Sequence, residues 1–152
     1  MRRPGGFEIE RELEIARPPS DVFDFLADTA SFKAVDPALV EFEPEGTLTL
    51  GMAGRFLHRR SGLPARSTWV VTAADPPRRL AVEIQGSGYG MTETADLEAT
   101  QEGSRVHFVD AVWPTSLAGR VMVALSGAIV RRDLAKRSAL LKAALEGAPP
   151  AR

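Results

Sequence analysis

Residues 117–146 read LAGRVMVALSGAIVRRDLAKRSALLKAALE and contain no proline. Apolar side chains recur along this stretch at helical spacing, which predicts one amphipathic helix of about 45 Å. The residues of the expected apolar face are Leu117, Val121, Leu125, Ile129, Leu134, Leu141 and Leu145. Arginines and lysines between positions 131 and 142 supply the polar face. The fold is therefore expected to end in a single long helix.

The sequence before this helix predicts short strands separated by tight turns. Residues 7–16 alternate apolar and charged side chains, as a half-buried strand does. Residues 20–28 and then 30–35 have the composition of two short helices. Six further strands are expected at 39–43, 53–60, 66–74, 79–85, 89–100 and 105–113. Proline and glycine turns at this spacing are typical of an antiparallel meander.

This order predicts an α+β fold with a curved seven-stranded antiparallel sheet. One face of such a sheet must be covered, and the long helix is the only element large enough to cover it. A curved sheet cannot close tightly on a straight helix. A cavity between the two is therefore expected.

Length and composition limit the class of protein. The 152 residues suit one domain, expected over 7–146, with disordered tails at 1–6 and 147–152. The net charge of −1 argues against a nucleic-acid binder and gives no reason to expect attraction to an anionic membrane. Cysteine is absent, which excludes disulfides and Cys-ligated metals. No stretch has the composition of a signal peptide or a bilayer span, so a cytoplasmic protein without integral membrane association is expected.

Three local motifs resemble a known superfamily. Residues 15–28, IARPPSDVFDFLAD, resemble the strand-to-helix entry of the START-like, or SRPBCC, helix-grip proteins. Residues 75–80, DPPRRL, resemble a turn between two middle strands, and residues 103–106, GSRV, resemble the last hairpin. The resemblance covers about residues 7–146 and looks closest to the bacterial polyketide cyclase/dehydrase and lipid-transport branch.

The resemblance implies a helix-grip fold whose cavity binds sterols, lipids, hormones or aromatic polyketides. Some members are enzymes, whereas many only carry or sense a ligand, and the fold does not decide between these roles. Members often have a tryptophan after the first short helices. This chain has none there, so Phe32 or Val35 would have to fill that position.

Strand alternation predicts which side chains face the cavity. The apolar parities of the strands are expected to supply its walls, and the long helix its roof. The expected wall residues are Phe56, Trp69, Val71, Val82, Ile84, Tyr89, Met91, Phe108 and Val112. The expected roof residues are Val121, Met122 and Leu125.

Polar residues on the apolar parities are the candidates for chemistry. Imidazole exchanges protons near neutral pH, so His58 is a candidate acid–base catalyst that Asp110 or Glu93 could orient. The alternatives are that His58 contacts a ligand without catalysing a reaction, or that it is a hydrogen-bonded residue of the core or rim. Glu93 and Asp110 could instead pair with arginines or face solvent. The Tyr89 hydroxyl could contact a ligand carbonyl, or the ring could pack in the hairpin.

These features favour a protein that binds a hydrophobic small molecule such as a polyketide, lipid or isoprenoid. Catalysis of polyketide cyclisation or dehydration by acid–base chemistry is the specific enzymatic hypothesis. A non-catalytic carrier or sensor and a stress-type partner-binding domain are the alternatives. No metal or organic cofactor is expected, because such chemistry needs only acid–base groups and shape. A homodimer is left open.

Overall fold

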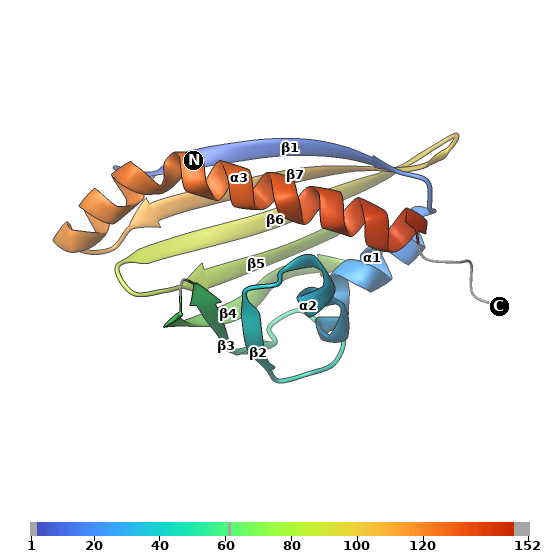
Figure 1. The fold of residues 1–152 in the computed structure, drawn as a ribbon. Coiled ribbons are helices and arrows are strands. Elements are labelled where there is room, and N and C mark those ends of the chain that lie inside the picture. Colours follow the sequence, from blue (N-terminus) through green and yellow to red (C-terminus); the bar gives the residue numbers. More distant parts are fainter. Residues whose placement is uncertain (1–2, 61, 148–152) are drawn as a thin grey trace.

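The structure is a computed structural model that describes residues 3–60 and 62–147. It has a seven-stranded antiparallel sheet with the strand order β1-β7-β6-β5-β4-β3-β2, and a long helix, α3, lies across one face (Figure 1). The strands are β1 (Phe7–Ile15), β2 (Leu39–Glu43), β3 (Ala53–Arg60), β4 (Leu63–Asp75), β5 (Arg79–Gln85), β6 (Tyr89–Thr100) and β7 (Gly103–Pro114). The helices are α1 (Pro19–Ala27), the short 3₁₀ helix η1 (Thr29–Ser31), α2 (Phe32–Val35) and α3 (Leu117–Gly147). The predicted helix-grip fold is confirmed.

Strands β2 to β7 form a meander in which every strand pairs with its neighbour in sequence. Strand β1 then pairs with β7, so the first and last strands of the chain lie side by side. This places β1 and β2 at the two edges of the sheet. On β1, Glu10, Glu12 and Glu14 are exposed. Arg105 of β7 forms ion pairs with two of them, at 3.1 Å to Glu12 and 2.6 Å to Glu14.

The second half of α3 is fastened to the start of the chain. Leu134, Leu141 and Leu145 are buried beneath it. The Arg17 Nε atom donates to the Leu145 carbonyl at 2.9 Å, and the Ala16 amide donates to Glu146 Oε2 at 2.8 Å. Because these bonds join the segment after β1 to the end of α3, they fix the helix across the sheet.

The first half of α3 meets the sheet through glycine. Gly119 is buried against the turn between β5 and β6, and a Cβ atom at this position would lie 1.9 Å from the Gly88 carbonyl oxygen. Val123 is also buried. The close approach of the two backbones requires a residue without a side chain.

The short helices connect β1 to β2 and lie beside the second half of α3 (Figure 1). Pro18 caps α1 and Pro19 begins it, which suits the first turn because proline lacks an N–H group. Val22, Phe23 and Ala27 bury one face of this helix. The cavity therefore has helices on two sides and the sheet on the third.

The observed boundaries differ from the predicted ones mainly at β4. This strand begins at Leu63 and not at Arg66, because the β3–β4 ladder continues through the pair Arg59 and Pro64. At the N-terminus, residues 3–6 form a turn in which the Gly6 amide bonds to the Arg3 carbonyl, and the Arg3 guanidinium lies 4.0 Å from the Trp113 ring. The other predicted tail residues, 1–2 and 148–152, lie outside the described part of the chain. Gly147 still belongs to α3. Among the helices of the described ranges, none is long and apolar enough to cross a membrane.

Candidate ligand cavity

A cavity of about 170 Å³ lies between the sheet and the helices α1, α2 and α3. Most of its wall is apolar, and aromatic rings form one side. Phe42 stacks on Trp69 with 4.8 Å between ring centroids, and Phe32 meets Phe42 edge-on at the same distance. Phe56 stacks on Phe42 at 6.0 Å. This cluster gives the cavity a rigid face suited to flat or chain-like apolar groups.

A smaller part of the wall is polar. Arg11, Asp36, His58, Glu93 and Arg137 all line the cavity. They come from β1, the segment before β2, β3, β6 and α3. Charged side chains in a largely apolar space are costly unless they are paired, and all five lie within three ion pairs.

The first pair joins Arg11 to Asp110 across β1 and β7. Arg11 Nη2 lies 2.8 Å from Asp110 Oδ2, while Nη1 donates to Ser138 Oγ at 2.6 Å and to the Leu134 carbonyl at 3.1 Å. The guanidinium group thus connects the sheet to α3. Asp110 is 1% exposed and does not itself line the cavity. Burial and the charge of Glu93 raise the pKa of Asp110 to about 6, against the opposing effect of Arg11.

The second pair joins Glu93 to Arg137. Arg137 Nη1 lies 3.3 Å from Glu93 Oε1, and both side chains are about one-third exposed. Glu93 and Asp110 are direct partners in the β6–β7 register, so their two carboxyl groups are neighbours on the same face of the sheet. Like charges in such a position repel. The charge of Glu93, with those of Asp36 and Asp110, raises the pKa of Arg137, which remains a cation.

The third pair joins His58 to Asp36. His58 Nε2 lies 2.6 Å from Asp36 Oδ2, and the Ala38 amide donates to Asp36 Oδ1 at 3.2 Å. Burial opposes the ionisation of Asp36, but the His58 hydrogen bond and the charge of Arg137 hold its pKa below the ordinary value. Because Asp36 is then a carboxylate, the imidazole donates from Nε2. Among the contacts of the described residues, Nδ1 of His58 has no hydrogen bond.

Several predicted site residues come together in this cavity. The lining includes the predicted acid–base residues His58 and Glu93. It also includes the predicted wall residues Phe56, Trp69, Val82, Ile84 and Phe108. Asp110 does not line the cavity. Its carboxylate accepts a hydrogen bond from Arg11, which does line it. The expectation that Asp110 or Glu93 orients His58 is wrong, because Asp36 holds the imidazole.

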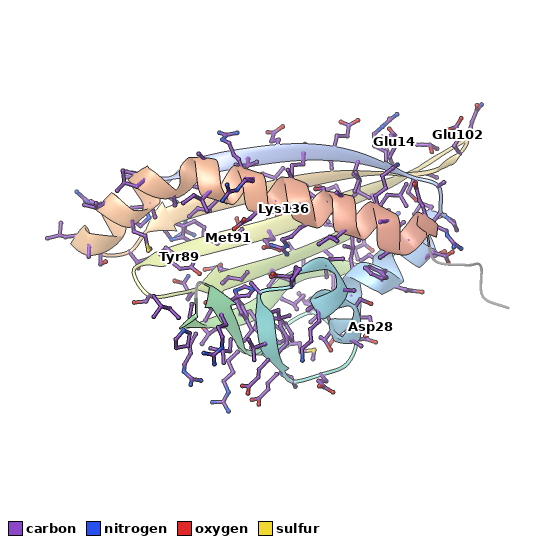
Figure 2. All side chains as sticks on the ribbon, viewed as in Figure 1. Glu14, Asp28, Tyr89, Met91, Glu102 and Lys136 are labelled. Carbon is purple, nitrogen blue, oxygen red and sulfur yellow. The ribbon has the colours of Figure 1, made fainter. Side chains whose placement is uncertain are left out.

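Other predicted wall residues lie elsewhere. Val71 and Val112 are buried in the sheet without lining the cavity. Tyr89 and Met91 are half-buried on β6 close to the β5–β6 turn, as Figure 2 shows, and are also outside the lining.

The expected roof is the clearest correction. Val121, Met122 and Leu125 are 62%, 43% and 76% exposed. Gly119 and Val123 take the sheet-facing side of this helical turn, so the residues between and after them point elsewhere. The α3 residues of the roof are instead Arg137 and Leu141.

The polar wall includes three residues that the sequence analysis missed. Arg11 occupies the apolar parity of β1, which was a usable signal. Arg137 lies three residues after Leu134 and four before Leu141, so helical spacing places it on the buried face. Asp36 gave no such signal, because an Asp-Pro pair after a short helix is typical of a turn.

Two buried donors, Arg11 Nε and Trp69 Nε1, lack a hydrogen-bond partner within the described residues. The indole Nε1 of Trp69 is buried and has no hydrogen bond, although Trp69 lines the cavity. A buried N–H group without an acceptor is unfavourable. Among the same residues, no group of three or more His, Asp or Glu side chains is placed to hold a metal ion.

The fold is shared with many solved structures. Protein CV1439 from Chromobacterium violaceum is 16% identical, with 94% of this chain and 99% of that chain covered and a TM-score of 0.73. Ara h 8.0201 is 16% identical, with 92% and 97% covered and a TM-score of 0.71. The Aha1 dimer structure from Colwellia psychrerythraea is 19% identical, with 92% and 96% covered and a TM-score of 0.65. At these identities the similarity establishes the fold alone.

The sequence comparison is more specific. No curated protein matches the chain significantly. The profile of a family described as polyketide cyclase / dehydrase and lipid transport matches residues 6–146, almost the whole chain. The chain therefore belongs to the polyketide cyclase/dehydrase and lipid transport family of the SRPBCC superfamily.

Proposed function

We propose that this protein binds a hydrophobic small molecule that carries oxygen groups at one end. The observation that carries the proposal is the cavity itself, with an aromatic and aliphatic wall on one side and paired charges on the other. Such a division is typical of small-molecule sites, where apolar area supplies affinity and a few polar groups fix orientation. The family description, which names polyketides and lipids, supports the same class.

The size and polarity of the cavity indicate what part of a ligand it takes. An apolar cavity of roughly 150 Å³ is enough to hold benzene. The 170 Å³ here thus suits a ring or a short chain segment, and a longer molecule would extend out of the cavity. A ligand carbonyl or hydroxyl oxygen could accept from Arg137, which lines the cavity. A polyketide, a lipid or an isoprenoid-like molecule meets these requirements.

A binding experiment tests this proposal. The probe is the neutral, apolar fluorophore N-phenyl-1-naphthylamine. Val82 lines the cavity, so Val82→Phe should fill it and weaken probe binding by at least about tenfold. Val109→Phe is the matched control, because Val109 is equally half-buried on the opposite face of the sheet. Equal affinity of wild type and Val82→Phe, or no binding of the probe to the wild-type protein, would contradict the proposal.

A second function, acid–base catalysis, is favoured by the pairing of His58 with Asp36. In a poly-β-ketone, His58 Nδ1 would take a proton from the carbon between two carbonyl groups. The resulting enolate carbon would attack another carbonyl of the same chain, and His58 would return the proton to the new alkoxide. Asp36 would stabilise the imidazolium in between. Glu93 and Asp110 would act by holding Arg137 and Arg11.

A product analysis tests the catalytic function separately from binding. With a synthetic 3,5,7-trioxo thioester as substrate, in which the carbon between the thioester and the 3-oxo group can attack the 7-oxo carbon, His58→Gln should lower the rate of cyclised product by about 100-fold, the usual scale for losing a general base. His107→Gln is the control, because this histidine is 43% exposed and lies outside the cavity lining. If His58→Gln leaves the product rate unchanged while the probe still binds, the protein is a carrier and not a cyclase.

A further inference from the structure

The first half of α3 has an apolar face that nothing covers in the described chain. Leu117, Val121, Leu125 and Ile129 follow one another every four residues and are 80%, 62%, 76% and 54% exposed. We call these four side chains the apolar face. Gly119 and Val123 are buried against the sheet on the opposite side of the same turns. The apolar face therefore points away from the sheet over about 18 Å of helix.

Soluble proteins seldom expose large apolar side chains in a row, and such patches mark interaction sites. The apolar face also lies outside the cavity lining. A role in holding the cavity ligand therefore does not explain it.

Charge along α3 distinguishes between the possible partners. The helix contains six basic and two acidic residues, a net charge of +4. The whole chain has a net charge of −1, so the remainder carries −5. Directly after the apolar face, Arg131, Arg132 and Lys136 are exposed. Of the two acidic residues, Asp133 is half-buried next to this cluster, and Glu146 bonds to Lys142 and the Ala16 amide at the far end of the helix.

A second copy of the chain is a poor partner for this surface. Two copies that met through their α3 helices would bring together two helices that each have a net charge of +4. Like charges across an interface suppress association.

We propose that the first half of α3 docks on the surface of an anionic lipid bilayer. Leu117, Val121, Leu125 and Ile129 would enter the boundary between head groups and acyl chains. Arg131, Arg132 and Lys136 would lie at the lipid phosphates. A helix with exposed Leu, Val and Ile side chains next to a basic cluster has the composition of an interfacial element. The net charge of −1 conceals this property, because the negative charge resides elsewhere in the chain.

Vesicle flotation of the full chain tests the docking. The protein should float with phosphatidylcholine vesicles that contain about one-third phosphatidylglycerol, and not with pure phosphatidylcholine. Raising the salt to about 0.5 M should release it, because the attraction to head groups is screened. Equal flotation with both vesicle types, or flotation with neither, would overturn the proposal.

Two pairs of variants identify the surface. Leu125→Ser should reduce the bound fraction at least about fivefold, whereas Leu50→Ser should not, although Leu50 is 68% exposed. Arg132→Glu should reduce it similarly, whereas Arg79→Glu, on the sheet face away from α3, should not. All four positions are at the surface, so each variant can fold. Unchanged binding of Leu125→Ser, or a wild-type dimer in solution that Leu125→Ser dissociates, would refute membrane docking.

Discussion

Asp110 owes its properties to its place in the β6–β7 register. It lies directly opposite Glu93, it is almost wholly buried, and Arg11 reaches it from β1. The first two features favour the protonated acid and the third favours the carboxylate, which leaves the pKa of Asp110 at about 6. The sheet next to the cavity thus contains a buried carboxyl group whose charge changes near neutral pH.

Glu93→Gln is expected to lower the pKa of Asp110 below about 6. The substitution removes the neighbouring negative charge, which is the second largest cause of the raised pKa after burial. Carbon-13 NMR of the labelled aspartate carboxyl groups measures the midpoint directly. Glu83→Gln is the control, because Glu83 lies on the next strand and outside the cavity lining. An Asp110 midpoint that does not move in Glu93→Gln would show that burial alone sets it.

Parity in the strands was enough to predict that His58, Glu93 and Asp110 face inward. It could not show their partners, because those come from distant elements: Asp36 from the segment before β2, Arg11 from β1 and Arg137 from α3. Pairing depends on how strands and helix are placed in three dimensions. The sequence pattern contains only the period of each element.

At the scale of elements, α3 is held differently at its two ends. Its second half is fixed by buried leucines and by hydrogen bonds to the segment after β1. Its first half depends on the contact between Gly119 and the Gly88 carbonyl. The close approach lets the Thr115 amide donate to the same carbonyl at 2.9 Å. A side chain at Gly119 would separate the helix from the β5–β6 turn.

Gly119→Ala is expected to destabilise the protein by about 2 kcal/mol or more, since the new methyl group would overlap backbone atoms that cannot move aside. Gly127→Ala is the matched control in the same helix, because a Cβ atom there meets nothing within 4 Å. The control should be stabilised by up to about 1 kcal/mol through helix propensity. Urea unfolding measures both changes. Equal stabilities of the two variants would argue against the close contact.

The elements were largely predictable because their ends depend on local chemistry. Proline and glycine turns separate the strands, and the absence of proline between Pro114 and Pro149 permits a long helix. The start of β4 was predicted three residues late because Pro64 suggested a turn. Proline is nevertheless tolerated in a strand at a position where no backbone N–H donor is needed for pairing.

For the whole molecule, the free energy of unfolding depends on pH through two buried carboxyl groups, those of Asp110 and Asp36, and their effects have opposite signs. The folded pKa of Asp110 is raised to about 6 from 3.8, so between these values the unfolded chain has released a proton that the folded chain keeps. Raising the pH through this window therefore favours unfolding. The pKa of Asp36 is lowered, so its contribution is present above pH 3.8 and is lost as the pH falls further.

Asp110→Asn is expected to flatten the stability profile between about pH 4 and 6. In the wild type, Asp110 contributes a decline of up to about 1.4 kcal/mol per pH unit, the limit for one proton. The variant cannot ionise and loses that contribution, while its amide oxygen can still accept a hydrogen bond from Arg11. Urea unfolding at a series of pH values measures the difference in slope. A parallel decline in both proteins would assign the pH dependence to other groups.

The exposed glutamates of β1 affect whether two copies of the chain can pair through this edge strand at high protein concentration. A sheet that does not close into a barrel leaves unpaired N–H and C=O groups along its outermost strands, and these can template aggregation. Strand β1 is such an edge, yet Glu10, Glu12 and Glu14 project from one of its faces and Arg11 from the other. A second β1 aligned alongside would set carboxylates against carboxylates. The same residues that fasten β1 to β7 and α3 thus protect the molecule from edge-to-edge polymerisation.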